Sequence, residues 1–159
     1  MRVKWLFFLF LLVGAAGCRS EEEEQSVQAQ TILYNQSHVS YLEQHGWNIA
    51  RFASEFKYSP GTLASFTEHV GDLRTKAHLD LFPYADQEVL ETGYILRETT
   101  HTYNVITAYL IEADGKIIGS YLVFEQQKQD ADGAYQTEDR QIEQMVHSGD
   151  GLGTTLSGP

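Results

Sequence analysis

Three strand-like runs between residues 88 and 127 limit the fold of this chain more than any other feature. The runs are EVLETGYILRE (88–98), HTYNVITAYLIEA (101–113) and KIIGSYLVFEQQ (116–127). Asp114-Gly115 joins the last two, and this dipeptide favours a tight hairpin because both central residues of a type I′ turn need positive φ. The spacing therefore predicts a three-stranded antiparallel meander.

Large side chains fall on both faces of this predicted meander. Successive residues of a strand point to opposite faces, so Tyr109 and Ile111 face one way while Ile106 and Leu110 face the other. We therefore expect neither face to be simply exposed to solvent. Core packing is the default explanation for the tyrosines of these runs, and an aromatic binding face is the alternative.

The residues before the meander predict a helix, a strand and a second helix. A helix over 31–45 has apolar residues at helical spacing and ends before Gly46, a common C-terminal residue. A strand over 50–58 alternates apolar and polar residues, which places Phe52 and Phe56 inward. A helix over 60–78 begins with a capping serine before a proline. Its predicted apolar face comprises Leu63, Phe66, Val70, Leu73 and Ala77.

The C-terminal residues predict a short helix and then a polar tail. TEDRQIEQMVH (137–147) can turn Ile142, Met145 and Val146 inward, whereas 148–159 is small and polar. The sequence thus predicts a single α+β domain over 31–147, built as helix-strand-helix, a three-stranded meander and a short C-terminal helix, with a disordered tail at 148–159.

The N-terminus is typical of a secretory signal peptide. Arg2 and Lys4 precede nine unbroken apolar residues, WLFFLFLLV, and the small residues that follow end at Cys18. A membrane-spanning helix needs about 20 apolar residues, and the 13 residues from Trp5 to Gly17 fall short of that. We therefore expect 1–17 to be cleaved from the mature chain.

Cys18 is predicted to carry a lipid anchor. The sequence Ala16-Gly17-Cys18 resembles the bacterial lipobox, which implies diacylglyceryl transfer to the thiol and cleavage before Cys18; ordinary cleavage after Gly17 is the alternative. Cys18 is also the only cysteine, and an unpaired cysteine in an exported protein suggests modification. Two acyl chains are enough for stable attachment. The expected location is the extracytoplasmic face of the cell membrane.

The charge of the chain limits its partners. Residues 18–30 are polar and acidic, which predicts a disordered tether. The removed segment contains two of the 11 basic residues and none of the 22 acidic ones, so the mature chain would carry a net charge of −13. Nucleic acid repels so acidic a protein. We expect a protein or small-molecule partner, and the membrane through the lipid on Cys18.

SYLEQHGW (40–47) and EADGKIIGS (112–120) make residues 41–124 similar to a domain family of Gram-positive lipoproteins, the domain-of-unknown-function family numbered 4830. Its landmarks are a helix ending in Gly-Trp, a following strand and proline-started helix, and the DGKIIG hairpin. Ala85-Asp86 stands where the family has Gly-Lys, so the hinge differs. The resemblance implies a small α+β fold and a membrane location, and it transfers no catalytic residue.

Four residues of the first predicted helix are candidate ligand contacts. Tyr34, His38, Tyr41 and His45 form a stripe, for which a border between core and solvent is the alternative explanation. His38 and His45 are seven residues apart, whereas two ligands of one metal on a helix need a spacing of four. We therefore predict no metal and no cofactor.

Chemistry is harder to predict than location. No nucleophile motif or paired acid and base is evident, so an enzyme is less expected than a binding or accessory module. The alternative is an exported metal-binding protein or hydrolytic enzyme that uses histidines. A zinc site at His69 and His78 with Glu68 or Asp80 would be one form of it.

Overall fold

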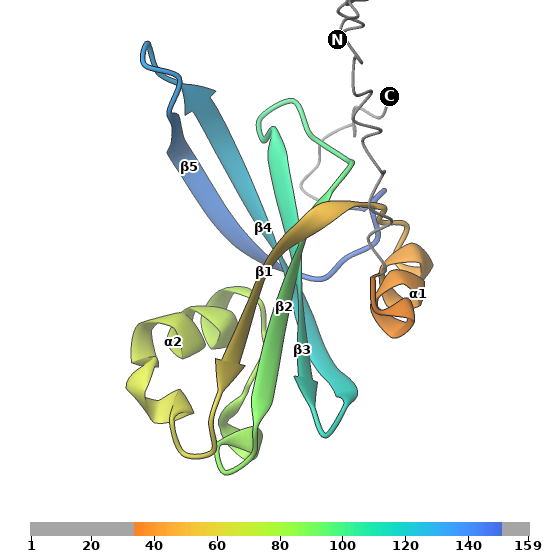
Figure 1. The fold of residues 1–159 in the computed structure, drawn as a ribbon, viewed down its shortest axis with the longest axis vertical. Helices are drawn as coiled ribbons and strands as arrows, with labels where there is room; N and C mark the ends of the chain where they lie inside the picture. Colours follow the sequence, from red (N-terminus) through yellow and green to blue (C-terminus); the bar gives the residue numbers. More distant parts are fainter. Residues whose placement is uncertain (1–33, 151–159) are drawn as a thin grey trace, which may run out of the picture. The chain divides into compact units, whose positions relative to one another are not determined.

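The computed structural model describes residues 34–150, which form one five-stranded antiparallel sheet with a helix on each face (Figure 1). The strands are β1 (Ile49–Tyr58), β2 (Val89–Leu96), β3 (Val105–Ala113), β4 (Lys116–Gln129) and β5 (Tyr135–Gln144), and they lie in sequence order across the sheet. The helices are α1 (Gln36–Gln44) and α2 (Thr67–Lys76). Two short 3₁₀ turns, η1 (Leu63–Ser65) and η2 (Phe82–Tyr84), flank α2 in sequence.

The predicted meander is confirmed as β2, β3 and β4. β2 pairs with β3 and β3 with β4, both antiparallel. Asp114 and Gly115 have φ of 48° and 67°, so both central residues of the hairpin have positive φ, as the dipeptide predicts. The prediction of α+β class is therefore right, but the sheet is larger than predicted, because β1 and β5 extend the meander at its two edges.

The alternation along the strands divides the apolar residues between two cores. Leu42 of α1 packs with one set of strand residues, including Ile106 and Leu110. Leu73 of α2 packs with the opposite set, including Ile111. Since Leu110 and Ile111 point to opposite faces, the two helices cover opposite sides of the sheet. The expectation that neither face of the meander is simply exposed to solvent is confirmed.

The first helix begins and ends at residues with clear capping roles. Asn35 is its N-cap, and its side-chain oxygen accepts a hydrogen bond from the Ser37 N–H at 3.0 Å. Gly46 follows the C-cap with φ of 77°, and the Trp47 N–H donates to the Leu42 carbonyl at 2.9 Å, which is a Schellman arrangement. The predicted start at residue 31 lies outside the described residues, and the described helix begins at Gln36.

The predicted helix over 60–78 is wrong in its first half. Gly61 has φ of 80°, which no helix accommodates, and Phe66 departs from helical geometry with ψ of 44°. The segment therefore folds as η1 followed by α2. Leu63, Leu73 and Ala77 still reach the core, but Phe66 stays 36 % exposed.

The predicted C-terminal helix is also wrong, because residues 135–144 form β5. β4 is long, and it offers its hydrogen-bonding edge to this segment from Tyr121 to Gln129. A turn closed by Asp130 and by Gly133, with φ of 85°, returns the chain to that edge. Pairing with β4 prevails over the weak helical spacing. Ile142 joins the core beneath α2, whereas Met145 and Val146 pack on the α1 side after the strand ends.

The strand predicted at 50–58 is confirmed as β1, but its predicted inward face is not. Phe52 is 43 % and Phe56 47 % exposed, and Tyr58 is the residue of this strand that is buried. β1 is an edge strand, and its register against β2 shifts between residues 49 and 51 and again between 52 and 54. These bulges turn the strand and interrupt its alternation.

The predicted signal peptide (1–17), the predicted tether (18–30) and Cys18 lie outside the described residues. Of the predicted tail, residues 148–150 are described, and the Ser148 N–H donates to the His45 carbonyl at 2.9 Å. Within residues 34–150, neither helix has the length and apolar character needed to span a membrane.

Candidate functional site

A buried carboxylate under α2 is the centre of a group of connected polar side chains. Glu91 of β2 is 5 % exposed. It accepts hydrogen bonds from the hydroxyl of Tyr58 at 2.6 Å and from that of Tyr121 at 2.5 Å. His69 Nε2 lies 3.0 Å from Glu91 Oε2. We call these four residues the Glu91 cluster.

Strand register brings the Glu91 cluster together. Glu91 lies opposite Phe56 of β1 and Ile111 of β3, on the face that α2 covers. Tyr58 is two residues beyond Phe56 and so points to the same face. His69 reaches down from the first turn of α2. The cluster therefore joins three strands to the helix by way of one carboxylate.

The environment of Glu91 favours its ionised form. Burial raises the pKa of Glu91, but the hydrogen bonds from His69, Tyr121 and Tyr58 outweigh burial and hold this pKa below its ordinary value. Burial, with the hydrogen bond and negative charge of Glu91, raises the pKa of Tyr58. The same causes raise the pKa of Tyr121. The tyrosines thus stay protonated as donors to an ionised acceptor.

A cleft of about 480 Å³ lies beside this cluster, between α2 and β5. His69 is the member of the cluster that reaches it: its side chain is 31 % exposed, whereas that of Glu91 is 7 % exposed. Polar residues of η1, α2 and β5 line the cleft, among them Ser65, Thr67, Glu68, His69, Asp72 and Arg140. A cation, two carboxylates and an imidazole thus face one space.

The chemistry available in this cleft is polar recognition. Glu91 bonds one nitrogen of His69 and so fixes the orientation of the ring at the edge of the cleft. Arg140 can pair with an anionic group, and Glu68 or Asp72 with a cationic one. The hydroxyls of Ser65 and Thr67 also line the cleft, but within residues 34–150 His69 forms its side-chain hydrogen bond with Glu91 and with neither hydroxyl.

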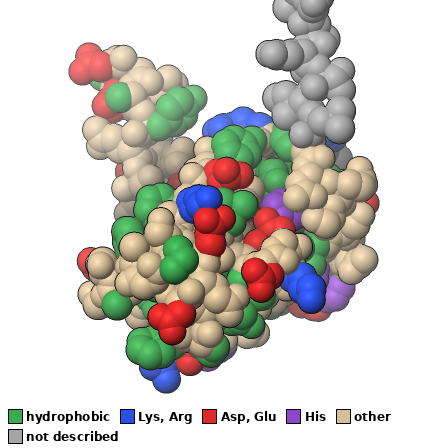
Figure 2. Space-filling view, turned by 60° about the horizontal axis from the view of Figure 1, so that its bottom comes forward, with side chains coloured by type: hydrophobic (Ala, Val, Ile, Leu, Met, Phe, Trp, Pro, Cys, Tyr) green, Lys and Arg blue, Asp and Glu red, His purple; other side chains and the backbone are tan. Residues whose placement is uncertain are grey.

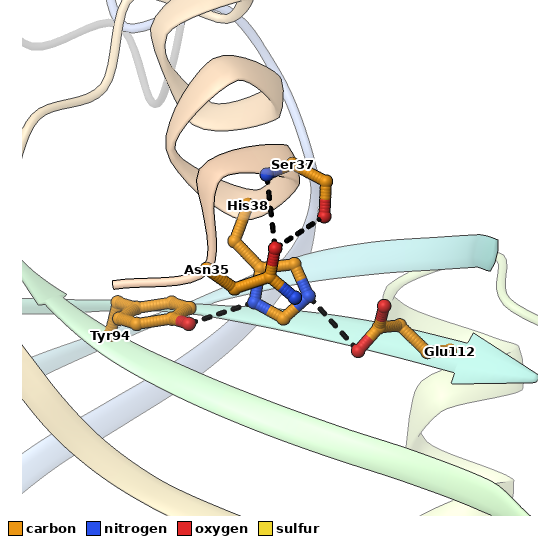
Figure 3. Close-up of polar contacts among 5 residues, drawn as sticks. All are labelled: Asn35, Ser37, His38, Tyr94 and Glu112. Carbon is orange, nitrogen blue, oxygen red and sulfur yellow. Dashed lines mark hydrogen bonds and ion pairs between the residues drawn. The ribbon is translucent and has the colours of Figure 1, made fainter. Parts of the chain in front are cut away.

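The predicted contact residue His38 belongs to a second buried group, on the α1 face (Figure 3). It is 2 % exposed, and its Nδ1 lies 2.7 Å from the hydroxyl of Tyr94. Its Nε2 lies 3.0 Å from a carboxylate oxygen of Glu112, at ion-pair distance but without the alignment of a directional hydrogen bond. His38 therefore holds α1 to β2 and β3.

The other three stripe residues also contact the sheet or one another. The Tyr41 hydroxyl lies 2.7 Å from that of Ser120, and His45 Nδ1 lies 2.9 Å from the Tyr41 carbonyl. Tyr34 packs edge-on against Tyr94, with ring centroids 5.8 Å apart. These contacts account for the stripe as the border of the α1 core. Tyr34 also lines a pocket of about 290 Å³ with Glu43 and Arg97. The ligand contact of the four stripe residues stays a prediction.

The histidines considered for zinc do not come together with further ligands. His78 and Asp80 are exposed, whereas His69 bonds Glu91. Across the described residues, no group of three His, Cys, Asp or Glu side chains has the geometry to hold a metal ion.

The sequence analysis missed both buried carboxylates. Glu91 lies two residues after Val89, and Glu112 lies two residues after Leu110, so each shares a strand face with a core residue. A carboxylate at an inward position of an apolar strand is the signal that could have found them, because such a charge needs partners when it is buried.

No family model, no curated protein and no solved structure matches this chain. The resemblance to the domain-of-unknown-function family numbered 4830 therefore stays a prediction.

Proposed function

We propose that this chain is a lipid-anchored extracytoplasmic binding module, held at the cell membrane by Cys18, that takes a protein or small-molecule partner at the cleft between α2 and β5. The observation that carries the proposal is the positioning of His69 at the cleft by the buried Glu91. A histidine fixed by a buried acid beside an open, polar cleft offers a pre-organised contact.

The charges of the cleft support a partner with polar or charged groups. Arg140 is a cation in a chain of net charge −11, and its side chain is 48 % exposed. Its ion pair with Glu125, at 3.5 Å between Nε and Oε1, is longer than a charge-assisted hydrogen bond, so the exposed guanidinium can also bind an anionic group. Figure 2 shows the protein from a different side, with acidic side chains dispersed among hydrophobic ones on the face that is visible.

The binding proposal is tested by capture from membranes with the full chain and two variants. Arg140→Glu reverses the cation in the cleft. Lys128→Glu is the matched control, because Lys128 is another exposed cation of the same hairpin, is paired with Glu138 and does not line the cleft. We expect saturable recovery of a partner by the wild-type chain and by Lys128→Glu, and its loss in Arg140→Glu. If the wild-type chain recovers no saturable partner, the proposal fails.

The anchor is tested separately at Cys18. Cys18→Ser removes the thiol that would be acylated, so we expect the protein to move from the membrane fraction to the soluble extracytoplasmic fraction. Unchanged membrane retention of this variant contradicts the lipid anchor but has no bearing on the proposal that the cleft binds a partner.

The alternative, an exported hydrolytic enzyme or metal-binding protein that uses histidines, has one observation in its favour. The Glu91-oriented His69 shares its cleft with the hydroxyls of Ser65 and Thr67. Hydrolysis of a nitrophenyl ester that disappears in His69→Ala but not in His101→Ala, an exposed histidine, would favour an enzyme. Metal analysis of the purified protein tests whether it is a metal-binding protein.

A further inference from the structure

One edge of the sheet is an open strand. β1 lies at the end of the strand order and pairs with β2 along one side, so in the described part of the chain its outer edge has no strand partner. Bulges interrupt its first half, and bulges commonly protect an edge from further pairing. The second half, residues 54–58, pairs with β2 in unbroken register from Ser54↔Gly93 to Tyr58↔Val89.

Most residues of this regular half are accessible to solvent. The Gly61 N–H donates to the Ala85 carbonyl at 2.7 Å, which ties the loop after β1 to the segment that leads into β2. Four of the five side chains, from Ser54 to Lys57, are exposed. The unpaired N–H and C=O groups of such an edge can accept another strand.

The sequence of this half, SEFKY, is complementary to itself when two copies run antiparallel. With the two-fold axis at Phe56, Glu55 lies opposite Lys57 of a second copy, and the symmetric pair repeats this contact. Centring the pairing at Glu55 would instead place glutamate opposite glutamate, and centring it at Lys57 would place lysine opposite lysine. Of these three registers, charge favours the one centred at Phe56.

The net charge of the chain does not prevent such a contact locally. The chain carries a net charge of −11, but β1 contains two cations, Arg51 and Lys57, and one acid, Glu55. Two copies of this strand can thus approach without the repulsion expected of the acidic surface as a whole.

The exposed aromatic residues lie at the same place. Phe56 is 47 % and Phe66 36 % exposed, and their ring centroids are 5.4 Å apart, over the buried Tyr58. With the axis at Phe56, the two Phe56 rings would meet across the joint and the two Phe66 rings would flank them. Aromatic cross-strand pairs are among those that stabilise a sheet.

We propose that two copies of this chain pair through β1, antiparallel about Phe56, and so join their sheets into one. The partner is a second copy because the opposite charges and the aromatic pair arise from the same five residues on both sides. Attachment of both copies to one membrane would raise their effective concentration, so a weak contact is enough.

The charge pattern is tested by sedimentation equilibrium of the exported full chain carrying Cys18→Ser, which removes the only cysteine. Glu55→Lys places lysine opposite lysine twice and should weaken the dimer about tenfold or more. Addition of Lys57→Glu restores opposite charges and should return the dimer Kd to near the wild-type value. Glu138→Lys on β5 is the matched control and should leave it unchanged.

Lys57 also has a partner within its own chain, Glu88, at 2.6 Å. Glu88→Gln removes that pair alone and should not change the dimer Kd. Thermal unfolding of each variant shows whether it is folded. A wild-type chain that stays monomeric up to its solubility limit overturns the proposal. So does a folded double variant that dimerises no better than Glu55→Lys.

Disulfide trapping tests the register without relying on charge. Opposite residues of antiparallel strands have Cα atoms about 4.5–5.5 Å apart, within the range that a disulfide spans. In the Cys18→Ser chain, Phe56→Cys should therefore oxidise to a covalent dimer. Ser54→Cys is the control on the same strand face. In the proposed register residue 54 lies opposite residue 58 of the second copy, so the two introduced thiols would not face each other. Equal cross-linking of the two variants contradicts a two-fold axis at Phe56.

Discussion

Removal of the Glu91 carboxylate is the perturbation whose effect the structure defines most closely. Tyr58 is 3 % and Tyr121 1 % exposed, and both donate their hydroxyl hydrogen to Glu91. In Glu91→Ala these two hydroxyls stay buried without an acceptor, whereas His69 can turn to water. A buried polar group that loses its hydrogen-bond partner lowers the free energy of unfolding by about 1–3 kcal/mol, and removing one partner of a buried charged group lowers it by about 3–5 kcal/mol.

We therefore expect Glu91→Ala to lower the free energy of unfolding by about 3–5 kcal/mol. Glu91→Gln keeps the volume and can still bond both hydroxyls, so it loses only the strengthening that a charged acceptor provides, about 1–2 kcal/mol in all. Glu138→Ala is the control, because Glu138 pairs with Lys128 on the surface and should contribute less than about 1 kcal/mol.

Urea unfolding followed by tryptophan fluorescence measures all three variants, since Trp47 is buried beside α1. A loss of less than about 1 kcal/mol in Glu91→Ala would refute the account, because the two hydroxyls would then have found other partners.

The same pair of proteins gives a pH test. The pKa of Glu91 lies below its ordinary value of 4.5, so ionised Glu91 stabilises the fold above that pH and this stabilisation is lost as the pH falls through the folded-state pKa. The difference in the free energy of unfolding between the wild-type chain and Glu91→Gln should therefore shrink below pH 4.5. A difference that stays constant there contradicts the lowered pKa.

Three further predictions concern other parts of the fold. Gly115→Ala should cost about 1 kcal/mol in urea unfolding, because φ of 67° strains a residue with a Cβ; no loss would contradict the turn geometry. Asn35→Ala should also cost about 1 kcal/mol, whereas Asn35→Asp, which keeps a capping oxygen, should cost less. Burial and the charge of Glu112 raise the pKa of Tyr94 to about 12, so stability present below pH 10 should fall between pH 10 and 12, and less steeply in Tyr94→Phe. Equal slopes in the two proteins would contradict that shift.

Local patterns predicted the elements whose signals do not depend on distant residues. The Asp114-Gly115 hairpin, the Gly46 end of α1 and the meander were all predicted, because positive φ and period-two alternation are properties of short stretches of chain. The N-terminal signals are of the same local kind, and they stay predictions because residues 1–33 lie outside the described part.

Tertiary pairing decided the elements for which local signals were weak or mixed. Residues 137–147 have a spacing that suits a helix, but the open edge of β4 satisfies their backbone groups as β5. Residues 60–78 have a continuous helical stripe, but the positive φ of Gly61 and the break at Phe66 shorten it to α2.

The candidate site depends on contacts that no sequence spacing shows. His38 was predicted to be a candidate ligand contact because of its place on a helix. The structure shows it buried against Tyr94 and Glu112, which are remote from it in the sequence. Glu91 and His69 were likewise brought together by strand register and helix packing. Sequence by itself determined the class of fold and the hairpin, and its prediction of a place at the membrane rests on residues outside the described part. The tertiary structure decided which polar groups are buried together, because burial depends on neighbours that are remote along the chain.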